Sequence, residues 1–504
     1  MKYRIDQING VKFGTSGARG LVCDMTDLVC YLYTIGFLQY AKKAEGSLAG
    51  QVAVAGDLRE STPRILRAVC KAIRDCGCVP VDCGKVPSPV VALYGLEKKI
   101  PSVMVTGSHI PEDRNGLKFN LSSGEILKRD EAGVKAEAVE VREEEFNSQG
   151  MFASGVNLPE PDSVEQLAKQ IYLDRFLKAL PPNALQGTRI GFYEHSAVGR
   201  DLLVELYTAL GAKVTRLGRS DKFMAVDTES VRPEDIELAR QWSKESPFDA
   251  ILSTDGDSDR PLLFDELGQW VRGDMLGILT ARFLAADIVV TPVNTSSSLE
   301  RCHWFPKIAR TQIGSPYVIE AMNECVQSGN QRVVGFEANG GFLTAQPMLL
   351  DERVASTFSA LPTRDPAIVH IAVLRMAKEQ GIPVSRLVEH LPQRFVASDR
   401  IQNVSPHHSR QNLENLIRGG TELLAETFRI FGELACHDAT DGLRLSFCDG
   451  NIVHLRASGN APEFRVYIEA DTKQQAENLL RDTMKFVMTT WIPLSSGTPG
   501  ERAG

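Results

Sequence analysis

The chain has 504 residues, of which 43% are hydrophobic and 24% charged, values that are ordinary for a globular protein and exclude a disordered or collagen-like chain. The formal net charge is −8, so we expect no nucleic-acid partner that binds through bulk positive charge. The N-terminal sequence MKYRIDQINGVKFGT has no apolar run of about 7 to 15 residues, and charged residues interrupt the longest apolar stretch, 275–293. We therefore expect a cytoplasmic protein without a membrane partner.

A strand–helix–strand pattern recurs along the first three quarters of the chain. Residues 52–84 contain an apolar strand, a polar turn, a helix with apolar residues at three-to-four spacing, and a second strand. Residues 189–218 repeat this scheme, and a weaker copy with a short helix near 297 runs from 287 to 336. Alternating strands and helices predict three similar α/β domains, each with helices packed on a parallel or mixed sheet.

The last part of the chain has a different pattern. A helix over 410–430, alternating strands in GLRLSFCDGNIVHLRASG and EFRVYIEAD, and a helix from 472 predict a smaller α+β domain with an antiparallel sheet. We therefore expect four domains and a loose, polar tail, with bounds at 1–160, 161–266, 267–383, 384–496 and 497–504.

The ten cysteines form no CxxC pair, and several lie in apolar segments, so we expect buried free thiols. Cys76, Cys78 and Cys83 are close enough in sequence to suggest zinc. However, no second cluster stands at the spacing that zinc ligands require.

The segment TGSHIPEDRNGLKF, residues 106–119, places Ser108 beside His109 directly after the apolar strand SVMVT. Neighbouring side chains point apart, so these two residues do not form the pair of a catalytic triad. A Gly-rich turn at the carboxyl end of a strand is, however, where α/β domains bind ligands. A phosphoryl group on Ser108 would add about −1.5 to −2 charges, which Lys118 could offset during phosphoryl transfer. The alternative is a turn or helix-capping serine.

The segment FDAILSTDGDSDRPLLFDE, residues 248–266, carries three alternating aspartates, Asp255, Asp257 and Asp259. In an extended backbone they project to one side, where each pair would repel by about 4 kcal/mol at a separation of about 4 Å. A cation should therefore bind there, and oxygen ligands near phosphate favour Mg²⁺. Arg260 would add positive charge near the transferred group. An EF-hand calcium loop, with Glu266 at its last position, and a solvated acidic turn are the alternatives.

Two further segments suggest sugar and phosphate binding. GFEANGGF, residues 335–342, places Glu337 and Asn339 on one face, where they could bind paired sugar hydroxyls, and its glycines would admit a ligand closely. RASGNAPEFRVYIEA, residues 456–470, could cradle a dianion through Arg456, Ser458, the backbone around Gly459 and Asn460, and Arg465.

A Gly-rich segment near the N-terminus is a third candidate for phosphate binding. In KFGTSGARG, residues 12–20, Arg19 could reach a phosphate group. The alternative for this segment is a flexible turn. The alternative for 335–342 is a surface loop, and that for 456–470 is a structural hairpin turn with a surface salt bridge.

These motifs, in this order, resemble the α-D-phosphohexomutase superfamily, which includes phosphomannomutases and phosphoglucomutases. The resemblance covers nearly the whole chain and rests on the serine loop, DGDSDR, GFEANGG and RASGNAPEFR, supported by FGTSGARG. It implies four domains around a central cleft, three α/β and a smaller C-terminal one that closes over substrate. Two positions depart from the usual pattern: Ile110 stands where TASHNP has asparagine, and Asn339 stands where serine is common.

The resemblance also implies roles for individual residues. Ser108 would be phosphorylated and would coordinate one Mg²⁺ per chain together with Asp255, Asp257 and Asp259. His109 and Lys118 would be acid/base or charge-stabilising groups, and Glu337 and Asn339 would bind sugar hydroxyls. The phosphate that is not being transferred would be held by Arg456, Ser458, Asn460 and Arg465, with Arg310 as a further candidate for a substrate contact.

We therefore expect an isomerase of carbohydrate metabolism that interconverts hexose 1-phosphate and hexose 6-phosphate, with hexose 1,6-bisphosphate as intermediate and activator. Mannose and glucose are both retained because nothing in the sequence selects between C2 epimers, and monomer and dimer both stay open. The alternatives are a phosphoglucosamine or N-acetylglucosamine-phosphate mutase, a metal-dependent phosphatase with a phosphoserine, and a binding protein without catalysis. The phosphatase would not need the arginines at 456–465.

Overall fold

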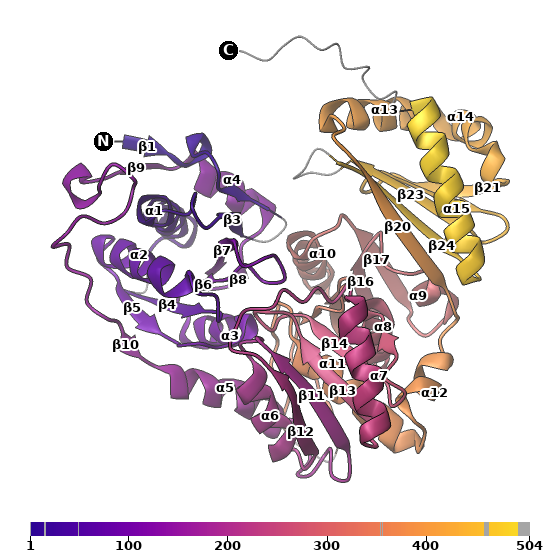
Figure 1. Cartoon of the computed structure of the whole chain (residues 1–504), viewed down its shortest axis with the longest axis horizontal. Helices are drawn as coiled ribbons and strands as arrows, with labels where there is room; N and C mark the ends of the chain where they lie inside the picture. Colours follow the sequence, from indigo (N-terminus) through magenta and orange to yellow (C-terminus); the bar gives the residue numbers. More distant parts are fainter. Residues whose placement is uncertain are drawn as a thin grey trace. The chain divides into compact units, whose positions relative to one another are not determined.

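The structure is a computed structural model that describes residues 2–14, 17–48, 50–352, 354, 356–457 and 463–491 (Figure 1). The chain divides into two compact units. The first unit contains Met1–Thr291, Trp304–Ala309 and Gly314–His390, and the second contains Pro292–His303, Arg310–Ile313 and Leu391–Gly504. The tail predicted at 497–504 lies outside the described residues. No helix in the described part is both long and apolar enough to cross a membrane.

The first sheet has the strand order β10-β5-β4-β6-β7-β3-β2, with β8 pairing β7. Its parallel half consists of β4 (Gln51–Gly56), β5 (Val79–Asp82), β6 (Ser102–Val105) and β10 (Asp162–Ser163). Its antiparallel part consists of β2 (Lys12–Phe13), β3 (Ala18–Leu21), β7 (Arg114–Leu121) and β8 (Gly124–Glu125). A separate two-stranded sheet pairs β1 (Lys2–Arg4) with β9 (Ala138–Glu140).

Four helices accompany the first sheet, and they differ in how completely they are buried. They are α1 (Asp27–Glu45), α2 (Thr62–Asp75), α3 (Ser88–Lys98) and α4 (Lys128–Ala136). In α2 the buried side chains follow the three-to-four spacing of an amphipathic helix, at Ile65, Ala68, Val69, Ala72 and Ile73. This spacing turns the apolar face of α2 toward the valines of β4 and β6 in the same hydrophobic core.

The second and third sheets repeat this plan and confirm the predicted strand–helix–strand units. The second has the order β12-β11-β13-β14-β15, formed by β11 (Arg189–His195), β12 (Lys213–Arg219), β13 (Ala250–Thr254), β14 (Pro261–Phe264) and β15 (Trp270–Val271). Its helices are α5 (Glu165–Leu177), α6 (Arg200–Ala209) and α7 (Pro233–Glu245).

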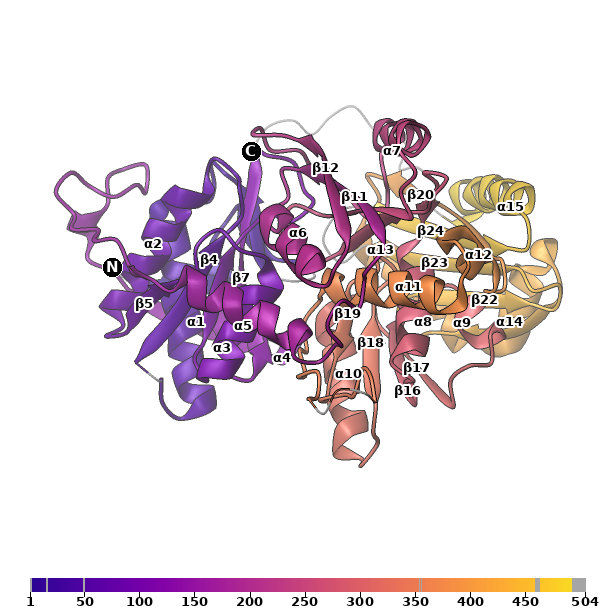
Figure 2. The same cartoon turned by 90° about the horizontal axis from the view of Figure 1, so that it is seen from below.

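The third sheet has the order β17-β16-β18-β19, formed by β16 (Ile288–Pro292), β17 (Lys307–Thr311), β18 (Val333–Phe336) and β19 (Phe342–Thr344). The helices of this region are α8 (Gly273–Phe283), α9 (Ser298–Arg301), α10 (Ser315–Gln327), α11 (Pro366–Gln380) and α12 (Val384–Glu389). Helices α8 and α11 pack against each other (Figure 2).

One topological position recurs in all three sheets. The last parallel strand turns directly into an antiparallel neighbour, at β6–β7, β13–β14 and β18–β19. The three turns cover residues 106–113, 255–260 and 337–341. They are the serine, acidic and Glu337 segments of the sequence, so the three motifs occupy equivalent places in three similar sheets.

The C-terminal sheet is antiparallel throughout, as predicted, with the order β20-β24-β23-β22-β21. Its strands are β20 (Phe395–Gln402), β21 (Leu434–Asp438), β22 (Leu443–Phe447), β23 (Ile452–Ala457) and β24 (Glu463–Ala470). Instead of one helix over 410–430, the chain forms α13 (Pro406–Arg418) and α14 (Gly420–Thr427), and α15 (Lys473–Phe486) follows the last strand. The helix breaks because Gly420 has a φ of 76°, which ends a right-handed helix. The domain bounds near 160, 266 and 383 stay predictions.

Candidate active site

The turn after β6 holds Ser108 in a strained conformation. Ser108 is buried, and its φ of 54° lies in the left-handed region that residues other than glycine seldom adopt. Its backbone N–H donates to Thr106 Oγ1 at 2.7 Å, and its carbonyl accepts from Arg59 Nη2 at 2.9 Å. Asp57 accepts from Thr106 Oγ1 at 2.7 Å and forms an ion pair with Arg59 Nε at 3.1 Å. Asp57 and Arg59 therefore fix the shape of the serine turn.

The sequence reasoning missed this ion pair, although GDLRES follows an apolar strand directly. Arg59 also donates to the carbonyls of Ile110, Pro111 and Arg114, at 2.6, 2.7 and 3.1 Å. A Cβ at Gly107 would lie 2.6 Å from the Arg59 guanidinium. Glycine is thus required at 107 because a buried arginine occupies the space beside it.

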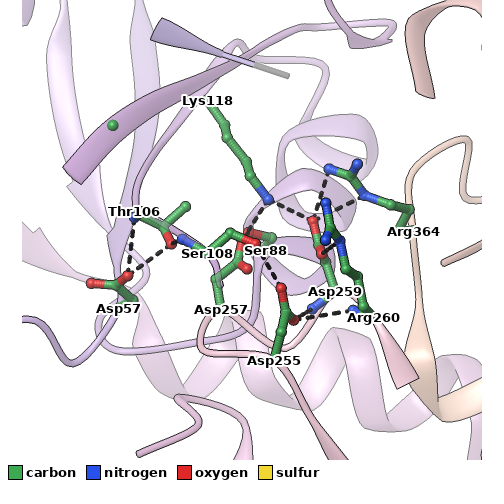
Figure 3. Close-up of polar contacts among 12 residues, drawn as sticks. Asp57, Ser88, Thr106, Ser108, Lys118, Asp255, Asp257, Asp259, Arg260 and Arg364 are labelled. Carbon is green, nitrogen blue, oxygen red and sulfur yellow. Dashed lines mark hydrogen bonds and ion pairs between the residues drawn. The ribbon is translucent and has the colours of Figure 1, made fainter. Parts of the chain in front are cut away.

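The three predicted aspartates meet Ser108 and Lys118 at one point (Figure 3). Asp255, Asp257 and Asp259 are at most 1% exposed, and one oxygen from each lies within 4.8 Å of the others. Ser108 Oγ donates to Asp255 Oδ2 at 2.6 Å. Lys118 Nζ lies 2.5 Å from both Asp257 Oδ2 and Asp259 Oδ2. The turns after β6 and β13 thus place the hydroxyl directly beside the acidic cluster.

The acidic cluster has the donors that a hard divalent cation requires. In the described part of the chain, Asp257 Oδ1 and Asp259 Oδ1 are buried without a hydrogen-bond partner. Buried carboxylate oxygens without partners are costly unless a cation compensates them. All the donors are oxygens, which suit Mg²⁺ or Ca²⁺ better than softer metals. The residues present therefore fit a bound divalent cation.

The two other metal interpretations of the sequence are not supported. A strand, β13, precedes the acidic turn where an EF-hand needs a helix. The Glu266 carboxylate accepts hydrogen bonds from the backbone N–H and the hydroxyl of Ser385 instead of joining the aspartates. Among the described residues, the three aspartates are the only group of three or more His, Cys, Asp or Glu side chains that could hold a metal, so Cys76, Cys78 and Cys83 form no such group.

Neighbouring charges shift the pKa values in this cluster in opposite directions. Burial, together with the charges of Asp257 and Asp259, raises the pKa of Asp255 well above its usual value. Burial acts in the same direction on Asp257, but Lys118 outweighs it and lowers the pKa of Asp257. Two of the three carboxylates thus share Lys118 as a counter-ion, and Asp255 instead accepts from Ser108.

His109 is held as a neutral imidazole. Burial and the nearby charges of Arg260 and Arg19 lower its pKa. Arg260 Nη1 lies 3.0 Å from His109 Nδ1, and because arginine only donates, Nδ1 is the acceptor and the ring proton sits on Nε2. His109 Nδ1 also lies 3.3 Å from Ser108 Oγ, so the expectation that these neighbouring side chains point apart is wrong. The left-handed backbone at Ser108 turns its side chain toward the imidazole.

Arg19 adds a cation to the same region. It lies on β3, directly opposite Gly116 of β7. Its Nε is buried and has no hydrogen-bond partner within the described ranges. Burial and the charge of Arg260 lower its pKa to about 10, so it stays charged at neutral pH. Arg19, Arg260 and Lys118 therefore make the region around Ser108 suited to an anion.

The turn after β18 places Glu337 and Asn339 in buried positions. Glu337 Oε2 accepts from Arg364 Nη1 at 3.1 Å, and Asn339 Oδ1 accepts from the Gly341 N–H at 2.9 Å. A Cβ at Gly341 would lie 2.6 Å from the Arg364 side chain, so protein occupies that side of the turn. That the glycines of this turn admit a ligand stays a prediction.

Ser88 and Arg364 belong to the site, although the sequence did not indicate them. Ser88, at the first turn of α3, donates its backbone N–H to Asp257 O at 3.0 Å and its hydroxyl to Asp257 Oδ2 at 2.5 Å. Arg364 donates through Nε to Asp259 Oδ2 at 3.0 Å. Neither residue stands in a motif, so only the folded chain reveals these contacts.

The predicted phosphate-binding residues lie in the second unit. Arg456 and Arg465 are directly opposite each other on β23 and β24, and Arg400 of β20 is opposite Arg465. Three arginines in register on one face repel one another, so an anion bound there would be favourable. Glu463 compensates part of this charge, at 2.9 Å from Arg400 and 3.4 Å from Arg465. Arg400 was missed, since strand register cannot be read from β20 alone.

Four other predicted residues remain, of which the structure describes only Arg310. Ser458, Gly459 and Asn460 lie outside the described residues. Arg310 donates to the backbone carbonyls of Pro292, Thr295 and Ser296, so its guanidinium supports the local backbone.

The comparisons with known proteins agree with the fold described above. Residues 10–145, 170–268 and 272–395 match the phosphoglucomutase/phosphomannomutase alpha/beta/alpha domains I, II and III, and residues 399–485 match the C-terminal domain of the same family. A phosphomannomutase of Sinorhizobium fredii is 41% identical over 487 residues, which cover 96% of this chain and 100% of that protein. A phosphomannomutase of Salmonella muenchen is 40% identical over 489 residues, 96% of each chain.

A solved structure of similar fold is described as a putative phosphomannomutase from Thermus thermophilus. It superposes with a TM-score of 0.73 at 19% identity and covers 95% of this chain and 100% of its own. At this identity the likeness concerns the fold alone.

Proposed function

The chain belongs to the phosphoglucomutase/phosphomannomutase family, and we propose that it interconverts hexose 1-phosphate and hexose 6-phosphate through a phosphoserine at Ser108. The observation that carries this proposal is the 2.6 Å hydrogen bond from Ser108 Oγ to Asp255 Oδ2, at the edge of a buried carboxylate cluster that also binds Lys118. The two relatives above carry the name phosphomannomutase, so mannose phosphates are the first substrates to test, followed by glucose phosphates.

In the first half of the reaction, the bond between phosphorus and Ser108 Oγ breaks as a sugar hydroxyl oxygen bonds to phosphorus, giving the hexose 1,6-bisphosphate. The proton lost by the sugar hydroxyl ends, in net terms, on Ser108 Oγ, which in the structure donates to Asp255 Oδ2. In the second half, the bisphosphate has turned round. Its other phosphoryl group moves to Ser108 Oγ, and a proton returns to the sugar oxygen that is released. The same bisphosphate would restore a dephosphorylated enzyme and thus act as activator.

Lys118 and His109 receive different roles. His109 Nδ1 already accepts from Arg260, and its Nε2 carries the ring proton, so the imidazole can donate a hydrogen bond but has no vacant nitrogen for a proton. Lys118 is our candidate for proton transfer at the sugar hydroxyl. As the ammonium partner of Asp257 and Asp259 it can give a proton to the sugar oxygen that is released, and it can take one from a sugar hydroxyl once it has done so. If this is correct, Lys118→Ala should lose most of its activity and regain part of it with added primary amines. Lys42→Ala, which removes an exposed amine from α1 of the same unit, is the control and should keep wild-type activity.

A divalent cation, one Mg²⁺ per chain, would be held by Asp255, Asp257, Asp259 and the phosphoryl group on Ser108. When bound, it would neutralise charge on the phosphoryl oxygens as a Lewis acid. Arg260 and Arg19 add positive charge from the protein itself, and such fixed charge is the main source of catalysis in phosphoryl transfer.

The substrate is proposed to contact two further groups of residues. Glu337 and Asn339 would bind sugar hydroxyls, because a carboxylate beside an amide offers both acceptors and donors. Arg456 and Arg465, with Ser458, Gly459 and Asn460, would hold the phosphate that is not being transferred. We add Arg400 to this group because it lies in register with Arg465.

The test is to prime the enzyme with hexose 1,6-bisphosphate and supply Mg²⁺ with mannose 1-phosphate, glucose 1-phosphate or glucosamine 1-phosphate in turn. Formation of the 6-phosphate identifies the mutase and its sugar, whereas release of inorganic phosphate without isomerisation would establish a phosphatase instead. Ser108→Ala should neither isomerise nor take up phosphate. Ser122→Ala, which removes a hydroxyl beyond the end of β7, serves as the control and should behave as wild type.

A further inference from the structure

Arg364 joins the two turns that carry Asp259 and Glu337. The residue stands in the segment between β19 and α11, and its side chain is 3% exposed. Figure 3 shows its guanidinium beside Asp259. Nε and Nη2 lie 3.0 and 2.9 Å from Asp259 Oδ2, and Nη1 lies 3.1 Å from Glu337 Oε2. One guanidinium thus spans a carboxylate of the acidic cluster and the proposed sugar-binding carboxylate.

The fold fixes Arg364 from both sides. The N–H of the next residue, Asp365, donates to Phe342 O at 2.9 Å, and its carboxylate caps α11 through the Ala367 N–H at 3.0 Å. The same carboxylate forms a buried ion pair with Arg175 at 2.6 Å. On the other side, Gly341 lacks the Cβ that would collide with the Arg364 stem. The backbone at 364 is therefore held rigidly while its guanidinium reaches across two turns.

This arrangement divides the oxygens of Asp259 between two tasks. Its Oδ2 binds both Lys118 and Arg364, and its Oδ1 is one of the buried oxygens without a hydrogen-bond partner in the described part. The Arg364 contact therefore orients Asp259 so that one oxygen remains for a cation. Through its other end, the same guanidinium orients Glu337.

We propose that Arg364 is a positioning residue that makes divalent-cation binding and sugar-phosphate binding cooperative. This inference rests on the proposed function, since it takes Asp259 as a cation ligand and Glu337 as a sugar ligand. A planar guanidinium can hold both carboxylates in fixed directions at once, whereas the single ammonium of lysine cannot. Displacing either carboxylate therefore disturbs the other through Arg364.

The experiment measures binding on the dephosphorylated enzyme, so that activity is not needed as a readout. Mn²⁺ affinity is determined by EPR with and without mannose 1-phosphate, and mannose 1-phosphate affinity by calorimetry with and without Mn²⁺. We expect each ligand to tighten the other by at least about fivefold in the wild type, the lower end of typical coupling. In Arg364→Lys and Arg364→Gln the coupling should fall to within twofold of unity.

A double-mutant cycle separates positioning from general damage. Glu337→Gln should weaken sugar-phosphate binding, and Arg364→Gln combined with Glu337→Gln should weaken it no further. The matched control is Arg375→Lys, which alters another buried arginine of the same unit that pairs with Asp351 and Glu379, and which should keep full coupling.

The inference is overturned if the wild type shows no coupling between the two ligands or if the Arg364 variants retain the coupling. It is also overturned if the effects of Arg364→Gln and Glu337→Gln on sugar-phosphate binding are additive. It is also overturned if both Arg364 variants show faster amide exchange throughout the first unit, because Arg364 would then serve the fold as a whole. Failure of the proposed function is distinguishable, because the wild-type enzyme would then fail to isomerise any hexose phosphate.

Discussion

Replacing Arg59 with methionine should loosen the serine turn and slow phosphoryl transfer. The substitution removes five hydrogen bonds, one to Asp57 and four to backbone carbonyls of residues 108–114. It also leaves the buried Asp57 carboxylate without its counter-ion, a change that typically costs about 3 to 5 kcal/mol. Asp57 keeps its hydrogen bonds from Thr62 and Thr106, so we expect the lower end of that range.

The effect on catalysis follows from the strained backbone of Ser108. A residue in the left-handed region costs about 1 to 3 kcal/mol and keeps that conformation only while its surroundings enforce it. Without the Arg59 contact to the Ser108 carbonyl, the turn should relax. The relaxed turn would then have to regain the strained conformation of Ser108 before it reacts. If this adds the whole strain energy to the activation barrier, kcat should fall by about 5- to 150-fold.

The assay has two parts because a chain of this length does not unfold in two states. Amide exchange followed by mass spectrometry reports the opening of residues 106–113, and steady-state kinetics report kcat. Arg67→Met, on the exposed side of α2, is the control and should match wild type. If the amide exchange of residues 106–113 and the kcat of Arg59→Met both stay within twofold of wild type, the reasoning is refuted. Adding Asp57→Asn to Arg59→Met should recover stability but not kcat.

Three further outcomes are expected. Ser88→Ala should weaken divalent-cation binding by about 3- to 10-fold, because a hydrogen bond to a charged group contributes about 1.5 to 3 kcal/mol and part of it is replaced by the cation; an unchanged Mn²⁺ titration would contradict this. Asp257→Asn should weaken Mn²⁺ binding, followed by EPR, far more than Ser88→Ala, while amide exchange outside residues 255–260 stays at the wild-type level; Mn²⁺ binding equal to that of the wild type would contradict this. Burial lowers the pKa of His370 to about 3 and that of His454 to about 4. Below about pH 6.5, the ordinary pKa of histidine, the unfolded chain therefore binds more protons than the folded chain, and the stability of the fold should decrease as the pH drops toward 4. His370→Gln should make this decrease shallower, and an identical slope would exclude His370 as a contributor.

The parts of the site that the sequence predicts share one property. Ser108, the three aspartates and Glu337 each follow an apolar strand within a short run that is rich in glycine or charge, and such runs mark the ligand-binding edge of an α/β sheet. Their mutual proximity required the fold, but their chemistry could be recognised locally.

The residues that were missed depend on partners far away in the chain. Arg364 and Asp259 are 105 residues apart, and Ser88 and Asp257 are 169 residues apart. A serine in VPSPV and an arginine in PTRDP have no local feature that distinguishes them from surface residues. The packing of Arg364 against Gly341 could not be predicted for the same reason, since that side chain comes from beyond β19.

The three reactive turns have a common mechanical basis. Each is clamped at both ends by two hydrogen-bonded strands of its own sheet, so a change inside one turn leaves the anchoring points of the other two unmoved. If Glu337 and Asn339 bind the sugar as proposed, substitutions within 337–341 that keep the ion pair between Arg364 and Glu337 should alter which sugar is accepted and leave the chemistry at 106–113 and 255–260 in place. A catalyst built in this way can change its substrate and keep its reaction.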